Sequence, residues 1–373
     1  MKNKIKVAIL YGGRSGEHEI SLQSAASVIR NLDQTRFEVI PVSIDKQGKW
    51  CYQDYSLLTS STKALPVFKN APEIFIPQRP LESEKNLLTV NGQKETRIDI
   101  VFPVLHGPLG EDGTVQGFLE LAEIPYVGAG VLASALGMDK EKAKILAKDA
   151  DIPIVPYVTL RQALWEKEKI SCIKKIKKDL QYPVFVKPAN MGSSVGVHRV
   201  RDEKNLEPAL IDAFRYDKKI LVEKAVSARE IEVSILENTD PNQLPLASVP
   251  GEVISHHEFY SYEAKYMDEK GAELIIPAHL TAQQIKRAQE IASGVFIALD
   301  CEGMGRVDLF LEKESGSFYF SEINTIPGFT TISMYPKLWE ASGISYKELL
   351  TRLIELALAR HERKKTLCRE YKP

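Results

Sequence analysis

This sequence has no excess of positive or negative charge. Its 49 lysine and arginine residues nearly balance 50 aspartate and glutamate residues, and the formal net charge is −1. Proteins that bind nucleic acids through bulk charge carry a basic surplus, so we expect no nucleic-acid partner. Cysteine is scarce too, because only four are present and no C-x-x-C pair occurs. Neither a disulfide framework nor a zinc ribbon is therefore predicted, and a reducing compartment fits.

Long hydrophobic runs are missing as well. Near the amino terminus only Val7 to Leu10 are continuously apolar before the glycines, which is too short for the core of a signal peptide. A membrane-spanning helix needs roughly 18 or more apolar residues in succession, and no window of the chain approaches that length. We therefore expect a cytoplasmic protein without a membrane partner.

The order of strand and helix patterns predicts an α/β protein. A length of 373 residues suggests two or three domains. The first segment reads as a strand at Lys6–Tyr11, a helix at Glu19–Asn31 and a strand at Phe37–Ile44, which is a βαβ opening. Residues 46–98 contain four prolines and are predicted to be an irregular elaboration on the surface. A second unit is expected to begin near Gly130.

The most informative stretch runs from Gly305 to Gly328 and reads GRVDLFLEKESGSFYFSEINTIPG. It predicts two strands joined by a turn. Alternation of side chains places Arg306 and Asp308 on one face of the first strand. On the second strand, alternation places four residues on one face: Phe318, Phe320, Glu322 and Asn324. A hairpin centred on Ser315 then sets Asp308 opposite Glu322 and Arg306 opposite Asn324.

Two facing carboxylates in this hairpin predict a cation site. Directly opposed side chains in an antiparallel pair lie roughly 5 Å apart, and like charges at that distance repel each other. Asp308, Glu322 and Asn324 all offer hard oxygen ligands, which suit Mg²⁺ and not a metal that prefers thiolates. The alternative is a solvated amphipathic hairpin. The neighbouring aromatic residues and Arg306 favour a site for a metal and a nucleotide.

A loop of small residues, NMGSSVG at 190–196, follows an extended run that ends near Lys187. Glycines and small side chains let backbone amides approach a phosphate closely, and the hydroxyls of Ser193 and Ser194 add donors. Lys187 supplies a point positive charge for the same phosphates. The loop has neither the Walker pattern nor G-x-G-x-x-G, and alone it would more often be a flexible turn. Together with the predicted Mg²⁺ site in the hairpin, this loop is predicted to close over the triphosphate of a nucleotide.

The end of the first strand carries the motif YGGRSGEHEIS at 11–21. Open α/β sheets bind ligands at such strand ends. Its glycines miss the spacing of a dinucleotide-binding fingerprint, and Glu17 stands where a pyrophosphate would need positive potential. A carboxylate there suits an ammonium group instead. His106, at the end of another strand, is predicted to face the same crevice, although a lone histidine in that position is more often structural.

Five motifs in order resemble those of the D-alanine–D-alanine ligases, which belong to the ATP-grasp superfamily. They are GGRSGEHEIS, HGPLGEDGTVQG, KPANMGSSVGV, YEAKY and the hairpin GRVD…EINTIPGFT. Together they extend over nearly the whole chain. The resemblance implies an N-terminal open parallel α/β domain (1–129) that binds substrate. It also implies two ATP-grasp domains of α+β character, a central one (130–224) and a C-terminal one that binds metal (225–373).

The resemblance also implies a nucleotide site between two sheets. Asp308, Glu322 and Asn324 would hold two Mg²⁺ ions, with Mn²⁺ as a possible substitute. The phosphates of ATP would meet Lys140, Lys187, Ser193 and Ser194. Adenine and ribose would meet Glu223, Ala225, Val226 and Glu230. Some relatives carry an aromatic residue where this chain has Ala225.

In the chemistry that the resemblance implies, one D-alanine receives the γ-phosphate on its carboxylate, and the amine of a second D-alanine displaces it. Splitting one condensation into two steps lowers each barrier. Arg306 and the backbone N–H of Gly328 would stabilise the oxyanion. Glu17, with His106 nearby, would hold the first ammonium group, and Lys265 with Ser333 the second carboxylate. Tyr266, Ser193 and Glu17 would form a hydrogen-bonded set.

Tyr266 favours a dipeptide product, because relatives that make a D-alanyl–D-lactate ester lack this tyrosine. The alternatives are a ligase of that ester-forming type and a nucleotide-binding module without catalysis. An intact set of Arg306, Asp308, Glu322, Asn324 and Lys187 argues against the module. The family also leads us to expect a homodimer.

Overall fold

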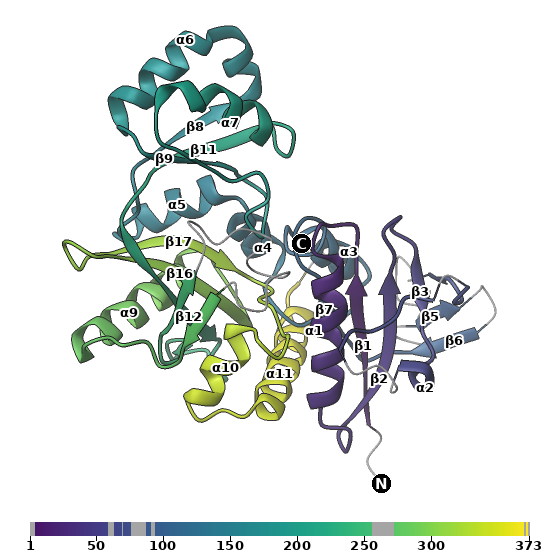
Figure 1. Cartoon of the computed structure of the whole chain (residues 1–373). Helices are drawn as coiled ribbons and strands as arrows, with labels where there is room; N and C mark the ends of the chain where they lie inside the picture. The colour runs from purple at the N-terminus through teal and green to yellow at the C-terminus, as the bar shows by residue number, and fades with distance from the viewer. Residues whose placement is uncertain are drawn as a thin grey trace.

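The computed structural model describes residues 4–58, 63–68, 70–75, 87–90, 94–255, 272–368 and 371. Its strands form four sheets, and helices cover them in a mixed α/β arrangement (Figure 1). The predicted fold class is thereby confirmed. Within these ranges, no helix combines the length and apolar character that crossing a membrane requires.

The N-terminal sheet has the strand order β3-β2-β1-β7, in which β1 pairs in parallel with both β2 and β7. Val7 to Tyr11 are almost completely buried, which is typical of a parallel strand covered on both faces. This confirms the predicted βαβ opening. The elements of this part are β1 (Ile5–Gly12), α1 (His18–Asn31), β2 (Phe37–Ile44), β3 (Trp50–Tyr52), α2 (Tyr55–Leu58), β7 (Ile100–Val104) and α3 (Thr114–Leu121).

The prediction that residues 46–98 are irregular is wrong for the described part of that segment. Besides β3 and α2, it contains a three-stranded antiparallel sheet of order β4-β5-β6. Its strands are too short to show a clear alternation in the sequence, and Pro66 and Pro72 precede them instead of interrupting them. They are β4 (Ile74–Phe75), β5 (Leu87–Val90) and β6 (Lys94–Arg97).

The central part of the chain folds into an antiparallel sheet of order β10-β9-β11-β8. Helices α6 and α7 cover it, and Trp165, Ile176 and Leu210 lie in the core that they share with it. Helix α5 lies between this sheet and β17 (Figure 1). The elements are α4 (Val131–Met138), α5 (Lys140–Asp149), β8 (Tyr157–Arg161), α6 (Gln162–Asp179), β9 (Val184–Pro188), β10 (His198–Val200), η1 (Glu203–Asn205), α7 (Leu206–Ala213) and β11 (Lys219–Lys224).

The largest sheet has the order β15-β14-β12-β16-β17, and β13 also pairs with β12. Helix α9 begins with a capping box at Thr281 and packs Ile291 and Val295 against the sheet. The elements are β12 (Ala228–Leu236), β13 (Leu246–Ala247), β14 (Gly251–Ser255), β15 (Ala272–Ile275), α9 (Ala282–Ala298), β16 (Met304–Glu312), β17 (Phe318–Asn324), α10 (Met334–Ala341) and α11 (Tyr346–Lys365).

The hairpin of β16 and β17 has the predicted register at its functional end. Asp308 pairs with Glu322, and Arg306 pairs with Asn324. A β-bulge after Asp308 then shifts the pairing by one residue. Phe318 and Phe320 therefore lie in the hydrophobic core and do not share a face with Glu322, which corrects the strict alternation expected from the sequence.

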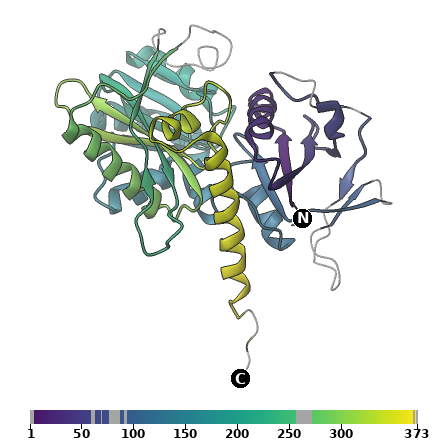
Figure 2. The ribbon, with the colours of Figure 1, turned by 90° about the horizontal axis from the view of Figure 1, so that it is seen from below.

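Helix α11 connects the last part of the chain to the first. It lies beside α1, and both contribute to one hydrophobic core with β1 and β7 (Figures 1 and 2). Arg360 of α11 is buried and donates to the carbonyl oxygens of Tyr126 at 2.7 Å and Gly128 at 2.6 Å. The N-terminal sheet is thus attached to the C-terminal helices by packing and by hydrogen bonds.

Candidate active site

A cavity of about 940 Å³ lies between the central sheet and the largest sheet, with strands of both in its walls. Most of the residues predicted for an active site line it. They are Lys140, Lys187, Ser193, Ser194, Glu223, Ala225, Val226, Glu230, Arg306, Asp308, Glu322, Gly328 and Ser333.

The carboxylates of the hairpin are held by cationic side chains. Arg306 donates from Nε and Nη2 to the two oxygens of Asp308, at 2.8 and 2.7 Å. Its Nε also lies 2.9 Å from Glu232 Oε2 on the neighbouring strand β12. Asn324 Nδ2 donates to Asp308 at 3.1 Å. Burial opposes the charge of Arg306, but Asp308 and Glu232 raise its pKa well above the ordinary value.

Glu322 meets a lysine from another element. Lys140 begins α5, after the N-cap Asp139, and its Nζ lies 3.1 Å from Glu322 Oε2 and 2.8 Å from the carbonyl oxygen of Met191. One lysine thus contacts both the hairpin and the serine loop. Each carboxylate of the predicted metal site therefore has a cationic partner in this structure.

The donor set at the end of the hairpin fits a hard divalent cation. Asp308, Glu322 and Asn324 offer carboxylate and amide oxygens on two adjacent strands, facing the cavity or directly beside it. In the ranges that the structure describes, there is no group of three or more histidine, cysteine, aspartate or glutamate residues that could hold a metal. Mg²⁺ commonly completes its octahedral coordination with waters and substrate phosphates, beside one or two carboxylates of the protein.

The loop after β9 contains two consecutive serines in a left-handed conformation. Ser193 and Ser194 have φ angles of 49° and 59°, a left-handed conformation that costs energy in residues other than glycine. Such conformations concentrate at functional sites and turn successive N–H groups towards one point. The hydroxyl of Ser193 donates to Glu17 Oε1. Gly192 leaves room for this contact, because a Cβ atom there would lie 2.8 Å from Glu17 Oε2.

Glu223 is a buried carboxylate between two lysines. Its Oε2 lies 2.5 Å from Lys187 Nζ, and its Oε1 lies 3.2 Å from Lys144 Nζ. Burial alone would raise the pKa of Glu223, but the two lysines lower it, so the carboxyl group stays ionised at neutral pH. The side chain that was predicted to meet adenine therefore also positions the lysine predicted to meet phosphate.

Gly328 and Ser333 lie next to each other, as the predicted substrate pocket requires. A Cβ atom on Gly328 would be 2.7 Å from Ser333 Oγ, so only glycine leaves this hydroxyl in place. Ser333 Oγ accepts from the backbone N–H of Thr330 at 3.0 Å and contacts the Thr330 hydroxyl at 2.8 Å. The loop after β17 is thereby folded back on itself at the cavity wall.

His106 lies behind the cavity and does not line it. Its Nδ1 donates to the carbonyl oxygen of Ile326 at 3.1 Å, and its Nε2 lies 3.0 Å from Ser24 Oγ. Burial alone would lower the pKa of His106, yet the carboxylates of Glu111 and Glu17 raise it above the ordinary value. Direct contact of His106 with a substrate stays a prediction.

Two predicted residues, Lys265 and Tyr266, lie outside the described residues. Two other residues with clear contacts were missed. Glu232 shares its strand face with Glu230, two positions away, so alternation could have found it. Lys144 is four positions after Lys140 on one helix face, but nothing in the sequence marks a lysine as buried.

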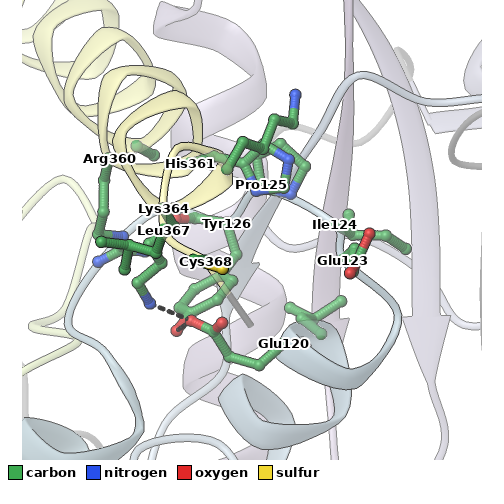
Figure 3. A pocket seen from close by; sticks show the side chains of 13 residues that line it. Glu120, Glu123, Ile124, Pro125, Tyr126, Arg360, His361, Lys364, Leu367 and Cys368 are labelled. Atoms are coloured by element: carbon green, nitrogen blue, oxygen red, sulfur yellow. Dashed lines mark hydrogen bonds and ion pairs between the residues drawn. The ribbon is translucent and has the colours of Figure 1, made fainter. Parts of the chain in front are cut away.

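A second cavity of about 360 Å³ lies far from these residues, between the end of α3 and the last turns of α11 (Figure 3). Its cations are already engaged: Lys364 pairs with Glu120 at 2.5 Å, and Arg360 binds backbone carbonyls. None of the predicted site residues line it. The larger cavity is therefore the candidate active site.

Two families of known domains match this chain in order. Residues 6–129 match the family described as D-ala D-ala ligase N-terminus, and residues 146–355 match D-ala D-ala ligase C-terminus. A D-alanine–D-alanine ligase A of Bradyrhizobium diazoefficiens is 54% identical over 377 residues, which cover 100% of both chains. A D-alanine–D-alanine ligase of Heliobacterium modesticaldum is 47% identical, with 99% of both chains covered.

Solved structures give the same result. A D-alanine-D-alanine ligase from Coxiella burnetii superposes with a TM-score of 0.80 at 34% identity, covering 97% of both chains. The VanG D-Ala:D-Ser ligase from Enterococcus faecalis superposes with a TM-score of 0.81 at 34% identity, covering 95% of this chain and 100% of its own. This protein belongs to the D-alanine–D-alanine ligase family.

Proposed function

We propose that the protein joins two D-alanine molecules into D-alanyl-D-alanine through an acyl phosphate, with cleavage of ATP to ADP and phosphate, for the synthesis of peptidoglycan precursors. The observation that carries this proposal is the single cavity that brings the hairpin carboxylates, Lys140, Lys187 and the serine loop together. A chain with this set of side chains has the parts needed for phosphoryl transfer to a carboxylate.

We expect ATP to bind in this cavity, because cationic side chains and a loop of small residues line it. Its phosphates would meet Lys140 and Lys187 and the amides and hydroxyls of Ser193 and Ser194, which approach from two sides. Adenine and ribose would lie along Glu223, Ala225, Val226 and Glu230, which line the same cavity. The ionised state of Glu223 supports this assignment, because it can accept a hydrogen bond from an exocyclic amine.

Asp308, Glu322 and Asn324 would hold two Mg²⁺ ions, or Mn²⁺ in their place. Bound there, the metal would neutralise charge on the phosphates. When Asp308 binds the metal with its carboxylate oxygens, the ion pair with Glu232 would hold Arg306 in place. Its remaining N–H groups can then donate to an oxyanion in the cavity.

The amino-acid chemistry is the one that the family resemblance implies. The carboxylate of the first D-alanine receives the γ-phosphate and becomes an acyl phosphate. The amine of the second D-alanine attacks its carbonyl carbon, and phosphate leaves with the electron pair of the broken C–O bond. Arg306 and the N–H of Gly328 would stabilise the oxyanion of that step, and each such donor contributes roughly 3 kcal/mol in other enzymes.

The substrates would be oriented by Glu17, which contacts the serine loop, and by Ser333 in the cavity wall. Glu17, held by Ser193, would accept the ammonium group of the first D-alanine, with His106 behind it. Ser333 would receive the carboxylate of the second D-alanine. Lys265 and Tyr266 are assigned to the same pocket by family resemblance alone.

We also propose a division into domains 1–129, 130–224 and 225–373, a cytoplasmic location and a homodimer, each expected from the family. Light scattering of the purified protein would test the dimer. A mass of about 84 kDa, twice 41.8 kDa, would support it, and a mass of 41.8 kDa would refute it.

Phosphate release from ATP tests the activity directly. It should occur with D-alanine and fail with L-alanine or without an amino acid, and mass spectrometry should find the D-alanine dipeptide. D-serine and D-lactate in mixtures with D-alanine test the two related ligase types. No release under any of these conditions would refute the proposed function and favour a nucleotide-binding module.

A further inference from the structure

Lys144 is the one fully buried charged side chain at the boundary between the two sheets of the site, within the ranges described. Its side chain is 0% exposed, and it lies on α5 one helical turn after Lys140. Helix α5 lies between the central sheet and β17 (Figure 1). The role inferred for Lys144 rests on the proposed binding of ATP in this cavity.

On the side of the central sheet, Lys144 shares a carboxylate with a phosphate-binding lysine. Lys144 Nζ lies 3.2 Å from Glu223 Oε1, while Lys187 Nζ lies 2.5 Å from Glu223 Oε2. Glu223 belongs to β11 and Lys187 to β9, and these two strands are adjacent and antiparallel in the central sheet. Each oxygen of the Glu223 carboxylate thus contacts one ammonium group. Of the two lysines, Lys187 lines the cavity and Lys144 does not.

On the side of the largest sheet, Lys144 contacts the backbone just before the β-bulge. Its Nζ donates to the carbonyl oxygen of Phe320 at 3.2 Å and lies 5.7 Å from the centre of the Phe320 ring. One turn earlier, Lys140 Nζ lies 3.1 Å from Glu322. The two lysines therefore contact β17 on either side of Ser321, the extra residue of the bulge.

The bulge decides where Glu322 points. Before it, Phe318 and Phe320 face the core, and after it Glu322 and Asn324 turn to the side of Asp308. A carbonyl group at a bulge has lost its regular ladder geometry, so a buried donor there stabilises the irregular backbone.

Burying an ammonium group is costly unless its donors are used, and burial lowers the pKa of Lys144 in spite of Glu223. An apolar side chain of similar length would fill the same space without that cost. A buried lysine at this position therefore indicates a task that an apolar side chain cannot perform. The contacts on both sheets identify that task.

We propose that Lys144 is a positioning residue that joins the nucleotide sheet to the metal-binding hairpin. Lys144 offsets the negative charge of Glu223, so that Lys187 can leave this carboxylate and contact a phosphate of ATP. Through the Phe320 carbonyl it fixes the bulge that brings Glu322 to Asp308. One buried ammonium group thereby sets the spacing between the two walls of the ATP site.

The test compares Lys144→Met with Lys142→Met, a matched control on the same helix. Lys142 is about half exposed and lies 3.8 Å from Glu141. Calorimetric titration with ADP, with and without Mg²⁺, reports nucleotide affinity, and steady-state kinetics report KM for ATP and for D-alanine. We expect Lys144→Met to weaken ADP binding roughly tenfold or more and to leave KM for D-alanine unchanged, since only the nucleotide walls are affected. Lys142→Met should resemble the wild type.

If Lys144→Met does not fold, the double variant Lys144→Met/Glu223→Gln replaces it, because it no longer carries a buried carboxylate with a single partner. Its reference is Glu223→Gln alone, since Glu223 is itself assigned to adenine, and the double variant should bind ADP more weakly than that reference. Wild-type affinity for ADP in Lys144→Met, or equal affinities of the double variant and Glu223→Gln where these replace it, would overturn the proposal. An equal rise of both KM values would overturn it too, since that indicates general loosening. The proposed function is judged separately, on phosphate release by the wild type with D-alanine.

Discussion

The Nε2 atom of His106 lies 3.0 Å from the hydroxyl oxygen of Ser24. The same oxygen accepts a hydrogen bond from the backbone N–H of Phe329 at 3.2 Å. Because His106 Nδ1 also donates to the carbonyl oxygen of Ile326, the chain is held on both sides of Gly328. The donor proposed for the oxyanion is thus positioned by a buried network that connects β7, α1 and the loop after β17.

Ser24→Ala should therefore reduce kcat more than it changes substrate binding. Without the hydroxyl, the Phe329 N–H loses its acceptor and the Gly328 N–H can shift, and small misplacements of this kind cost roughly 10- to 100-fold in rate. KM for ATP should change little. Steady-state kinetics of Ser24→Ala beside Asn31→Ala, a control on the same helix, measure this. Equal kcat values for the two variants would contradict a positioning role for Ser24.

Glu322→Gln should impair metal dependence. The amide keeps the shape of the side chain but loses the negative charge that attracts a divalent cation. Phosphate release should fall by roughly 100-fold or more and need more Mg²⁺ for half-maximal rate. Glu312→Gln, at the other end of the same hairpin, is the control and should behave as the wild type. An unchanged Mg²⁺ requirement in Glu322→Gln would remove this residue from the metal site.

Tyr266→Phe tests the choice between amine and hydroxyl as the attacking group. Family resemblance connects this tyrosine with the dipeptide product, so the variant should raise turnover with D-lactate relative to D-alanine at neutral pH. Competition between the two acceptors, followed by mass spectrometry of the products, gives the ratio. An unchanged ratio would separate Tyr266 from acceptor choice.

The pairing of Asp308 with Glu322 was predicted correctly, but the turn alone does not produce it. On the side of the turn, Leu309 pairs with Phe320, a register that would continue to Asp308 opposite Ser321. The bulge adds Ser321 to the strand and so brings Glu322 to Asp308. Strict alternation failed at the two phenylalanines, Phe318 and Phe320, for the same reason. Beside the bulge, Lys144 of α5 contacts the carbonyl oxygen of Phe320, and no local pattern in the hairpin marks a contact from so distant a helix.

Burial of charged side chains was the second feature that the sequence could not reveal. A lysine four positions after Lys140 is typical of a solvated helix face, and only the packing of α5 against two sheets buries Lys144. His106 was expected at the crevice because it ends a strand. The loop containing Ile326 covers it, and that loop comes from a distant part of the chain.

Stability should depend on the charge of Asp33 in acid. Hydrogen bonds from Thr35 and Lys347 lower its pKa from 3.8 to about 2. A carboxyl group with a lowered pKa stabilises the fold above its ordinary value, and this contribution is lost as pH falls from 3.8 through about 2. The difference in unfolding free energy between wild type and Asp33→Asn should therefore be constant near neutral pH and shrink in that window. Urea titrations at several pH values measure it, and a difference that grows in acid would contradict the assignment.

Arg360→Leu should destabilise the protein without changing its substrate affinities. The guanidinium group is buried, donates to the carbonyl oxygens of Tyr126 and Gly128, and lies 4.6 Å from the centre of the Tyr126 ring. Leucine would leave both carbonyl groups without these donors, which costs about 2–4 kcal/mol in unfolding free energy.

Arg352→Leu is the matched control on the same helix. Arg352 is one-third exposed and pairs with Glu348, so its loss should cost less than about 1 kcal/mol. Denaturation curves of the two variants measure the costs, and KM values for ATP and D-alanine should stay at wild-type levels in both. Equal stability of the two variants would show that the attachment of α11 to the N-terminal sheet depends on apolar packing and not on Arg360.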